Sequence, residues 1–318
     1  MNKIKSTACV FPGQGSQKRG MLAEFMDTAI VRDTFSEASD VLKYDVWDMI
    51  QHDAENKLDQ TEYTQPAMMV ADVAIYRAFH EKLTQAGLKP NFAFMAGHSL
   101  GEYAALVCSE AISLADGAEL VKHRGRLMQE IIPSGKGAMA AIVGLTDEQV
   151  IDLCKKAAED EVLDAANFNS VGQVVIAGDT SAVNRALVLA MEEGAKLAKI
   201  IPVSVPCHCY LLSPVAEALS EYLEKITINT PKTPLIHNVH VETLSDPQDI
   251  REILKKQLYQ PVQWVATIRK MIDSGVTNII ECGPGSVLTG LNKRIDRAIQ
   301  CQSIFDPTSL DKVLTNLE

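Results

Sequence analysis

The sequence lacks any apolar stretch long enough to cross a membrane. Its longest uncharged apolar stretches, such as residues 137–145, fall well short of the roughly 20 residues that a membrane-spanning helix needs. The apolar run at residues 8–11 is interrupted by Pro12 and Gly13 before the hydrophobic region of a signal peptide can form. We therefore expect no membrane partner and a cytoplasmic protein.

The sequence also lacks an excess of basic residues. Its 318 residues include 30 Lys and Arg against 41 Asp and Glu, so its formal net charge is -11 at pH 7. Such a balance works against binding to nucleic acid or to anionic membranes. We expect no nucleic-acid partner, and an acidic protein partner would require a local basic patch.

The cysteines do not form the pattern of a disulfide framework. They are odd in number and scattered through apolar segments, as is typical of reduced, buried thiols in a reducing compartment: positions 9, 108, 154, 207, 209, 282 and 301. Cys207, His208 and Cys209 with His237 and His240 are residue types that bind zinc, but their spacing matches no common zinc knuckle. We expect no metal.

The common nucleotide-binding and metalloprotease motifs are incomplete. Gly13 and Gly15 begin like a dinucleotide fingerprint, but Lys18 stands where its third glycine belongs. Lys136 is followed by glycine, and a P-loop requires Ser or Thr at that position. The pair at residues 80–81 lacks the second histidine of an H-E-x-x-H site. We expect no cofactor.

What is present is typical of a globular α/β protein. Hydrophobic residues make up 47% of the chain and charged residues 22%, and no linker or low-complexity run divides it. Strands are expected at residues 7–11, 92–96, 235–239 and 277–281, and helices at 67–86, 102–110, 116–131, 247–258, 261–273 and 286–298, where the last helix closes the chain. This alternation predicts a mainly parallel sheet covered on both faces, with ligands at the carboxyl ends of its strands.

Between residues 138 and 203 the expected strands and helices follow a different order. Strands are expected at 138–143, 163–168, 173–177 and 197–203, with helices at 146–158 and 180–193. Thr146 and Gln149 are spaced as a capping box at the start of the first helix. The order βαββαβ predicts a ferredoxin-like small subdomain at residues 131–204, inserted into a large domain formed by residues 1–130 and 205–318.

A serine nucleophile is predicted at the end of the second strand. Residues 97–101 have the form G-x-S-x-G, in which a serine lies on a sharp turn between a strand and a helix. That turn places Ser99 at a helix N-terminus, where backbone N–H groups stabilise a negatively charged intermediate. The pentapeptide also occurs by chance in loops, so its place between an apolar strand and a helix carries the prediction. We expect the large domain to be α/β-hydrolase-like.

A serine nucleophile needs a base, and His208 follows an apolar strand at the end of that element, where a side chain can reach a cleft. No acidic residue stands beside it, so a backbone carbonyl could orient its ring. Arg124 lies in the helix that contains His123. It is either a solvated residue on the helix surface or a two-pronged site for a substrate carboxylate.

Taken together, these motifs resemble the malonyl-CoA:acyl-carrier-protein transacylases of fatty-acid synthesis, in their bacterial freestanding form. The resemblance runs almost from end to end of the chain. It is carried by eight ordered blocks, namely FPGQGSQ at 11–17, QPA at 65–67, GHSLGEY at 97–103, RG at 124–125, NFNS at 167–170, VPCH at 205–208, PVQW at 261–264 and ECGPG at 281–285.

The resemblance implies a set of catalytic roles. Ser99 would be acylated and His208 would act as its base. The backbone N–H groups of Gln14 and Leu100 would form the oxyanion hole, and the backbone carbonyl of Gln263 would orient His208.

The resemblance also implies the substrates. Arg124 would bind the free carboxylate of malonate, and Met128 and Asn167 would contribute to the substrate site. The partners would be malonyl-CoA and phosphopantetheinylated acyl carrier protein, and we expect a monomer. Cys207 and Tyr210 depart from the family's usual residues and bear on acyl selectivity. An acidic carrier protein would bind basic residues beside the cleft, for which the sequence offers Lys196, Lys199, Lys293 and Arg294.

Two other classes of function remain open. A serine thioesterase or lipase uses the same turn, but it would place an acidic residue between Ser99 and His208 in the chain and would not need a carboxylate-binding arginine. A non-catalytic acyl-binding protein would keep the fold and bind without forming an acyl-serine. The intact Ser99 and His208 argue against that reading.

Overall fold

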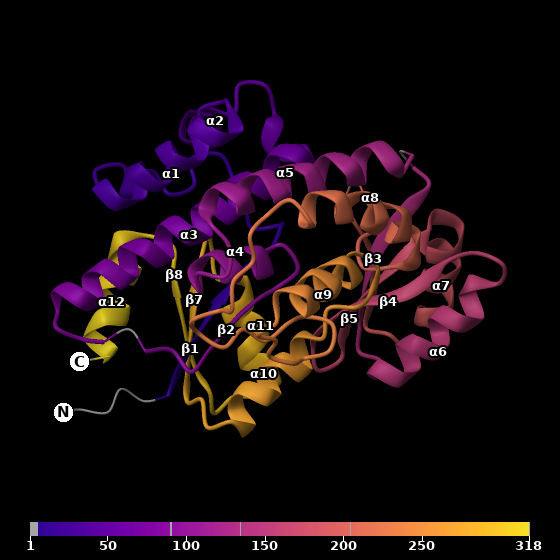
Figure 1. Ribbon diagram of the computed structural model, residues 1–318. Helices are drawn as coiled ribbons and strands as arrows, with labels where there is room; N and C mark the ends of the chain where they lie inside the picture. Colours follow the sequence, from indigo (N-terminus) through magenta and orange to yellow (C-terminus); the bar gives the residue numbers. More distant parts are fainter. Residues whose placement is uncertain (1–5, 90, 134, 204, 318) are drawn as a thin grey trace.

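The strands of the protein form two separate sheets. The structure is a computed structural model that describes residues 6–89, 91–133, 135–203 and 205–317. The larger part is built on a four-stranded sheet of order β2-β1-β7-β8, in which every pairing is parallel (Figure 1). Its strands are β1 (Thr7–Phe11), β2 (Phe94–Gly97), β7 (Asn278–Cys282) and β8 (Gln300–Ile304).

Helices cover both faces of the parallel sheet, so every residue of β1 and β7 is buried. Because side chains alternate along a strand, Cys9 and Phe11 enter one core cluster while Ala8 and Val10 enter another. The cluster of Cys9 and Phe11 includes residues of α1 (Ala29–Leu42), α2 (Val46–His52), α3 (Thr61–Gln85), α4 (Gly101–Cys108), α5 (Leu114–Ile131), α8 (Ser213–Leu223), α9 (Pro247–Tyr259) and α12 (Pro307–Leu317). The other cluster includes α10 (Trp264–Asp273) and α11 (Val287–Ile295). Short 3-10 helices lie at Ala23–Phe25, Lys57–Asp59 and Tyr210–Leu212.

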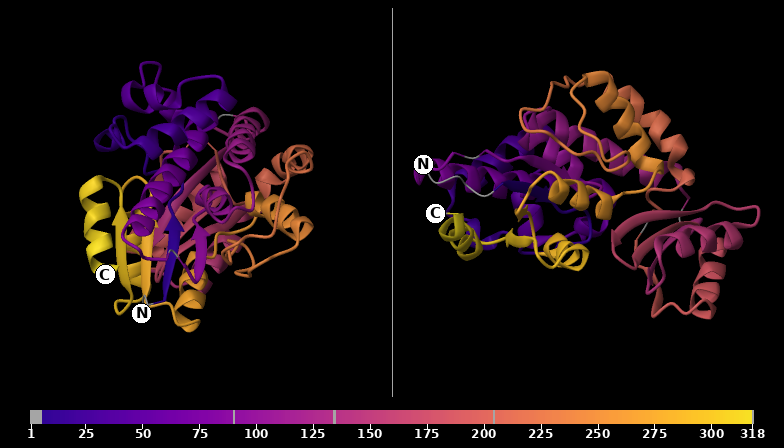
Figure 2. Two further views of the ribbon diagram at one scale, coloured as in Figure 1. Left: turned by 60° about the vertical axis from the view of Figure 1, so that its left-hand side comes forward. Right: turned by 90° about the horizontal axis from the view of Figure 1, so that it is seen from below.

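The second sheet confirms the predicted ferredoxin-like unit. Its chain order is β3 (Gly137–Val143), α6 (Asp147–Ala158), β4 (Leu163–Ser170), β5 (Gln173–Asp179), α7 (Thr180–Glu192) and β6 (Leu197–Ile201). The antiparallel sheet order is β4-β5-β3-β6. The capping box of Thr146 and Gln149 is present. This unit has a core cluster of its own and lies beside the larger part (Figure 2, right).

We propose that residues 131–204 form the inserted subdomain and that residues 1–130 and 205–318 form the large domain. The separate core cluster of the second sheet and the end of α5 at Ile131 support this division. Residues 1–5, 204 and 318, at the limits of these ranges, lie outside the described residues. Within the described residues, no helix is both long and apolar enough to cross a membrane.

Several predicted elements were wrong in kind or in extent. The segment at 235–239 forms only isolated bridges, in which Leu235 pairs with Met95 and Ile236 pairs with Thr243. Helix α3 begins at Thr61 and not at residue 67, and Pro66 lies inside it. The chain does not close with the helix after residue 286, because β8 and α12 follow. Helices α1, α2 and α8 were also not predicted.

Candidate active site

Ser99 lies on a sharp turn between β2 and α4, as the sequence predicted. Its backbone has φ 52°, in the left-handed region that non-glycine residues seldom adopt. The flanking glycines allow the turn to pack closely. A Cβ atom on Gly97 would overlap the backbone of Gly101, and one on Gly101 would overlap the carbonyl oxygen of Phe11. The serine is thereby held against the carboxyl end of β1.

His208 contacts Ser99 directly. The Oγ atom of Ser99 lies 2.7 Å from Nε2 of His208, and Nδ1 of His208 lies 2.7 Å from the backbone carbonyl oxygen of Gln257. A carbonyl only accepts, so Nδ1 carries the proton and Nε2 is left free to accept from the serine hydroxyl. The two side chains therefore have the geometry of a nucleophile and its base.

The carbonyl that orients His208 is not the one that the resemblance implied. Gln263 precedes α10, and its carbonyl accepts a hydrogen bond from Thr267. Gln257 lies in the last turn of α9, where helix carbonyls have no partner within the helix. The backbone N–H of His208 also donates to the carbonyl of Leu258 at 3.0 Å. His208 thus caps the end of α9, a long-range contact that sequence spacing does not reveal.

The imidazole of His208 is held in its neutral form. The residue is 2% exposed. Burial, followed by the positive charge of Arg124, lowers the pKa of His208 to about 3. At neutral pH the ring is therefore unprotonated and able to accept a proton from Ser99.

Arg124 is buried and not solvated on the surface of α5. It is 2% exposed; its Nη1 donates to Oε1 of Gln65 at 2.8 Å, and its Nη2 donates to Oε1 of Gln257 at 3.3 Å. Its Nε has no hydrogen-bond partner, and no carboxylate of the described residues forms an ion pair with it. A buried positive charge that touches only neutral acceptors is suited to bind an anion.

Two backbone N–H groups beside Ser99 are free to bind an oxyanion. Leu100 directly precedes α4, and Gln14 lies in the loop after β1. Neither N–H donates a hydrogen bond to any group in the described part of the chain. The loop of Gln14 approaches the serine turn closely, since a Cβ atom on Gly13 would lie 2.5 Å from the carbonyl oxygen of His98.

These residues line one cleft of about 750 Å³ between the two sheets. The large domain contributes Gln14, Ser99, Leu100, Arg124 and His208, and the small one contributes Met139, Asn167, Val175 and Ile201. Asn167, which the resemblance assigned to the substrate site, thus lines this cleft. Met128 is buried and does not line the cleft. Its sulfur accepts a hydrogen bond at 3.4 Å from Nε2 of Gln65, the residue that contacts Arg124.

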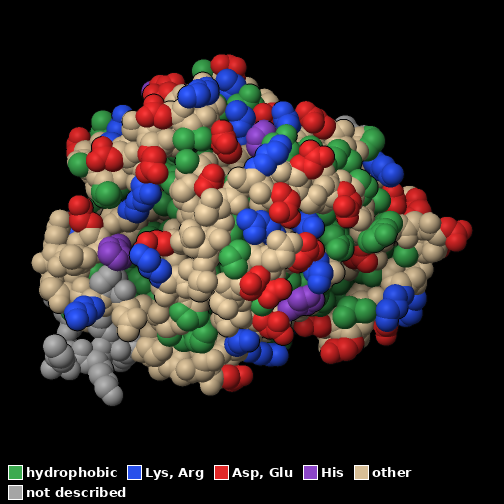
Figure 3. Space-filling model, in the orientation of Figure 1, with side chains coloured by type: hydrophobic (Ala, Val, Ile, Leu, Met, Phe, Trp, Pro, Cys, Tyr) green, Lys and Arg blue, Asp and Glu red, His purple; other side chains and the backbone are tan. Residues whose placement is uncertain are grey.

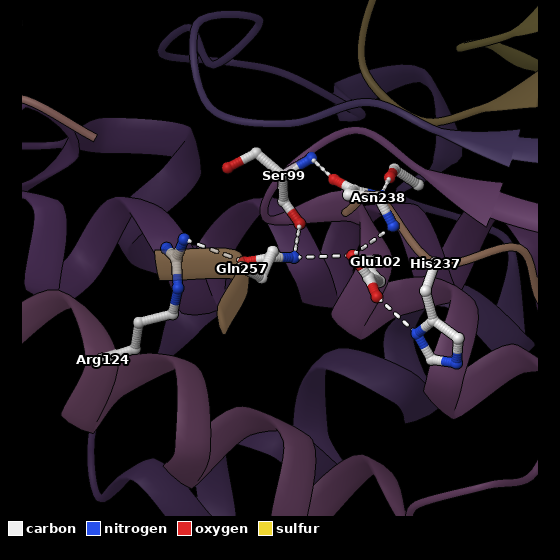
Figure 4. Close-up of polar contacts among 7 residues, drawn as sticks. Ser99, Glu102, Arg124, His237, Asn238 and Gln257 are labelled. Atoms are coloured by element: carbon white, nitrogen blue, oxygen red, sulfur yellow. Dashed lines mark hydrogen bonds and ion pairs between the residues drawn. The ribbon is translucent and has the colours of Figure 1, made fainter. Parts of the chain in front are cut away.

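A buried polar network that the sequence reasoning missed holds the serine turn. Figure 4 shows Asn238 beside Ser99: its Oδ1 accepts from the backbone N–H of Ser99 at 2.7 Å, and its Nδ2 donates to the carbonyl of Gly97 at 2.6 Å. Glu102, only three residues after Ser99, belongs to the same network, so its place in the motif was a usable signal. Asn238 and Gln257 carried no such signal, because tertiary packing brings them to the site.

A nucleophilic serine, an unprotonated histidine and free N–H donors define a class of enzymes that transfer acyl groups through a serine ester. The chain belongs to the acyl transferase family, since the family model described as an acyl transferase domain matches residues 8–303.

Named relatives agree with this membership. The chain is 50% identical over 311 residues to a malonyl CoA-acyl carrier protein transacylase from Haemophilus influenzae, covering 98% of each chain. It is 47% identical to one from Escherichia coli strain K12, covering 96% of this chain and 98% of the relative. A solved transacylase of that name from Coxiella burnetii has a TM-score of 0.94 and 47% identity, with 98% of each chain covered. A malonyl-transacylase solved in complex with a type II PKS acyl-carrier protein has a TM-score of 0.94 and 45% identity, covering 98% of this chain and 99% of that one.

Proposed function

We propose that this protein transfers a malonyl group from malonyl-CoA to the phosphopantetheine thiol of acyl carrier protein, through a malonyl ester of Ser99, and so supplies fatty-acid synthesis. The observation that carries the proposal is the pairing of Ser99 with His208 beside the buried Arg124, which contacts no carboxylate among the described residues. The relatives named as malonyl CoA-acyl carrier protein transacylases support it.

In the first half-reaction, Nε2 of His208 takes the proton of the Ser99 hydroxyl while Oγ attacks the thioester carbonyl of malonyl-CoA. The carbonyl oxygen becomes an oxyanion, to which the N–H groups of Leu100 and Gln14 donate. Loss of one such donor typically costs about 3 kcal/mol of transition-state stabilisation. The intermediate collapses as the C–S bond breaks, and the departing CoA thiolate receives the proton from His208.

The second half-reaction runs the same chemistry with another thiol. The phosphopantetheine thiol gives its proton to His208, and its sulfur attacks the ester carbonyl. The second oxyanion accepts hydrogen bonds from the same N–H groups of Leu100 and Gln14. Collapse breaks the bond to Oγ, and Ser99 regains its proton from His208. The exchange is therefore ping-pong, with no net change in the enzyme.

Arg124 accounts for a preference for malonyl over acetyl. A malonyl carboxylate would give the guanidinium the anion that it lacks. An acetyl group would cover the guanidinium without pairing it, at a cost on the order of 2 kcal/mol. Transfer must also outrun hydrolysis of the ester, so we infer that the walls of the cleft exclude water once the acyl group is bound.

The carrier protein is proposed to bind beside the mouth of the cleft. Lys196 and Lys199 are exposed at and beside β6, and Lys293 and Arg294 are exposed on α11. Both elements supply cleft-lining residues. On the face seen in Figure 3, basic and acidic side chains are interspersed, so that face offers no continuous basic surface.

Charge reversal tests this docking site. Replacing Lys196 and Lys199 with Glu is expected to raise the KM for carrier protein and to reduce its dependence on salt, because basic side chains steer an acidic partner. Lys312→Glu, on the distant α12, is the control. An unchanged KM and an unchanged salt dependence in the double variant would reject the patch.

Intact-protein mass spectrometry tests the function itself. Wild type and Ser99→Ala are mixed briefly with malonyl-CoA or acetyl-CoA and then with phosphopantetheinylated carrier protein. One malonyl group on wild type alone, discharged onto the carrier, is expected. An adduct that persists in Ser99→Ala would place the nucleophile elsewhere. Release of free malonate in the presence of carrier protein would favour a serine thioesterase or lipase.

We also infer a cytoplasmic location and a monomer. All seven cysteines are free thiols, which supports a reducing compartment. Subcellular fractionation tests the location and light scattering tests the oligomeric state.

A further inference from the structure

A cluster of buried polar side chains lies behind the cleft, and the proposed chemistry does not use it. Glu102, His237, Asn238 and Gln257 are each 0% exposed, and none of them lines the cleft. In Figure 4, Gln257 lies between Arg124 on one side and Glu102 on the other. Because burying polar groups is costly unless their hydrogen bonds are satisfied, the partners of each group show what the cluster holds in place.

Glu102 is the centre of the cluster. Its Oε1 accepts from Nδ1 of His237 at 2.6 Å, and its Oε2 accepts from Nε2 of Gln257 at 2.8 Å and from the backbone N–H of Asn238 at 3.3 Å. A carboxylate can only accept hydrogen bonds, so each partner must turn a proton toward it. Glu102 therefore dictates the orientation of its neighbours.

The side-chain amide of Gln257 has one orientation that satisfies all its neighbours. Its Nε2 donates to Glu102 and to the backbone carbonyl of Ser99 at 2.9 Å, while its Oε1 accepts from Nη2 of Arg124 at 3.3 Å. The carboxylate and the carbonyl only accept, and the guanidinium only donates. Turning the amide by half a rotation would set Oε1 against two acceptors and N–H against the guanidinium.

This orientation keeps Arg124 available to an anion. Both of its hydrogen bonds go to neutral amide oxygens, those of Gln257 and Gln65, and its guanidinium also lies over the uncharged ring of Tyr103. The amide of Gln65 is directed by the sulfur of Met128, a weak acceptor, whereas that of Gln257 is directed by the Glu102 carboxylate. The Gln257 amide thus separates the Glu102 carboxylate from Arg124, and the two charged groups do not form an ion pair.

We propose that Glu102 is a positioning residue for acyl selectivity: it orients the Gln257 amide, and that amide holds the Arg124 guanidinium in place for a carboxylate in the cleft. The inference rests on the proposed function, because it concerns how a malonyl group is preferred. The backbone carbonyl that orients His208 belongs to the helix α9 and does not turn with the Gln257 side chain. Loss of Glu102 is therefore expected to change acyl preference more than acylation itself.

Two substitutions of Glu102 separate these effects. Glu102→Met removes the acceptor at similar length. Glu102→Gln keeps an acceptor oxygen for Gln257 and can donate to the other tautomer of His237. The rate constants for acylation of Ser99 by malonyl-CoA and by acetyl-CoA are measured by quenched flow with intact-protein mass spectrometry. In Glu102→Met the malonyl-to-acetyl ratio of rate constants is expected to fall by about tenfold or more, and in Glu102→Gln to stay within about threefold of wild type.

Thr34→Val is the matched control for loss of a buried polar group. The Thr34 hydroxyl is also fully buried and donates to the carbonyl of Ile30 at 2.7 Å, but it does not line the cleft. This variant is expected to keep the wild-type ratio. Circular dichroism and thermal unfolding show whether each variant is folded.

The ratio decides between positioning and mere structural support. A folded Glu102→Met variant with the wild-type ratio, or with both rates reduced in parallel, overturns the proposal. So does a Glu102→Gln variant that loses as much selectivity as Glu102→Met. If Glu102→Met does not fold, Gln257→Met removes the oriented amide itself, and an unchanged ratio there overturns the proposal equally. Failure of the proposed function is seen separately, as wild type that acquires no malonyl group.

Discussion

Replacing Arg124 with alanine is expected to reverse the acyl preference of the protein. The guanidinium is 2% exposed and touches only neutral acceptors, so in wild type a malonyl carboxylate would be its first anionic partner. Charge-assisted hydrogen bonds of this kind contribute about 1.5–3 kcal/mol. Their loss in Arg124→Ala should slow acylation by malonyl-CoA by roughly 10- to 150-fold. Acylation by acetyl-CoA should accelerate, because its methyl group no longer covers an unpaired charge.

The assay is the rate of Ser99 acylation from each thioester, followed by mass spectrometry. Arg124→Lys keeps the charge but not the two-pronged geometry, so we expect an intermediate preference. Arg126→Ala is the control, since Arg126 lies on the same helix but contacts Tyr222 and Glu130 and does not line the cleft. An Arg124→Ala variant that retains the wild-type malonyl-to-acetyl ratio would refute the assignment of the carboxylate site.

Three further predictions follow from other parts of the structure. The pKa of His208 is lowered to about 3, first by burial and then by Arg124, so the base stays neutral and acylation by acetyl-CoA should be independent of pH from about 5 to 8. In Arg124→Ala the pKa of His208 should rise, so the loss of activity on acidification should begin at a higher pH. A pH profile of kcat/KM checks both expectations. Gly101→Ala should destabilise the fold by about 3 kcal/mol or more in chemical denaturation, since its Cβ would overlap the backbone of Phe11, whereas Gly290→Ala, with nothing within 4 Å, should be tolerated. Burial raises the pKa of Asp72 well above its usual value, so the folded state holds a proton that the unfolded chain releases above about pH 4. The contribution of Asp72 to the free energy of unfolding should therefore fall as pH rises, and Asp72→Asn, which carries no such proton, should gain stability relative to wild type between pH 5 and 8. A constant stability difference across that range would contradict a protonated Asp72.

The elements that the sequence predicted well are those whose pattern is local. The capping box at Thr146 and Gln149 lies within one turn of α6, and the buried strand β1 is a continuous apolar run ended by Pro12 and Gly13. The edge strand β8 has the sequence QCQSI, in which three of five residues are polar, so it lacks the apolar run by which the buried strands were recognised. The segment near Leu235 is apolar like a strand, yet it makes only isolated bridges.

In the candidate site too, the residues predicted correctly are those with a local sequence pattern. Ser99 could be predicted because the turn that presents it needs glycines at fixed spacing around it, and His208 because it follows an apolar strand. The orienting carbonyl was misassigned to Gln263, since every residue has a carbonyl and only its position in space distinguishes that of Gln257. Met128 was expected at the substrate site, but it is buried and does not line the cleft.

The sequence by itself determined the fold class, the inserted ferredoxin-like unit and the serine turn, because these depend on periodicity and glycine placement, and the resemblance indicated Gln14, Leu100 and Asn167. Only the tertiary structure decided whether Arg124 is solvated or buried, which carbonyl holds His208, and that Glu102 orients the Gln257 amide. Charge, burial and the direction of a hydrogen bond depend on which groups surround a side chain, and those groups come from helices that are far apart in the chain.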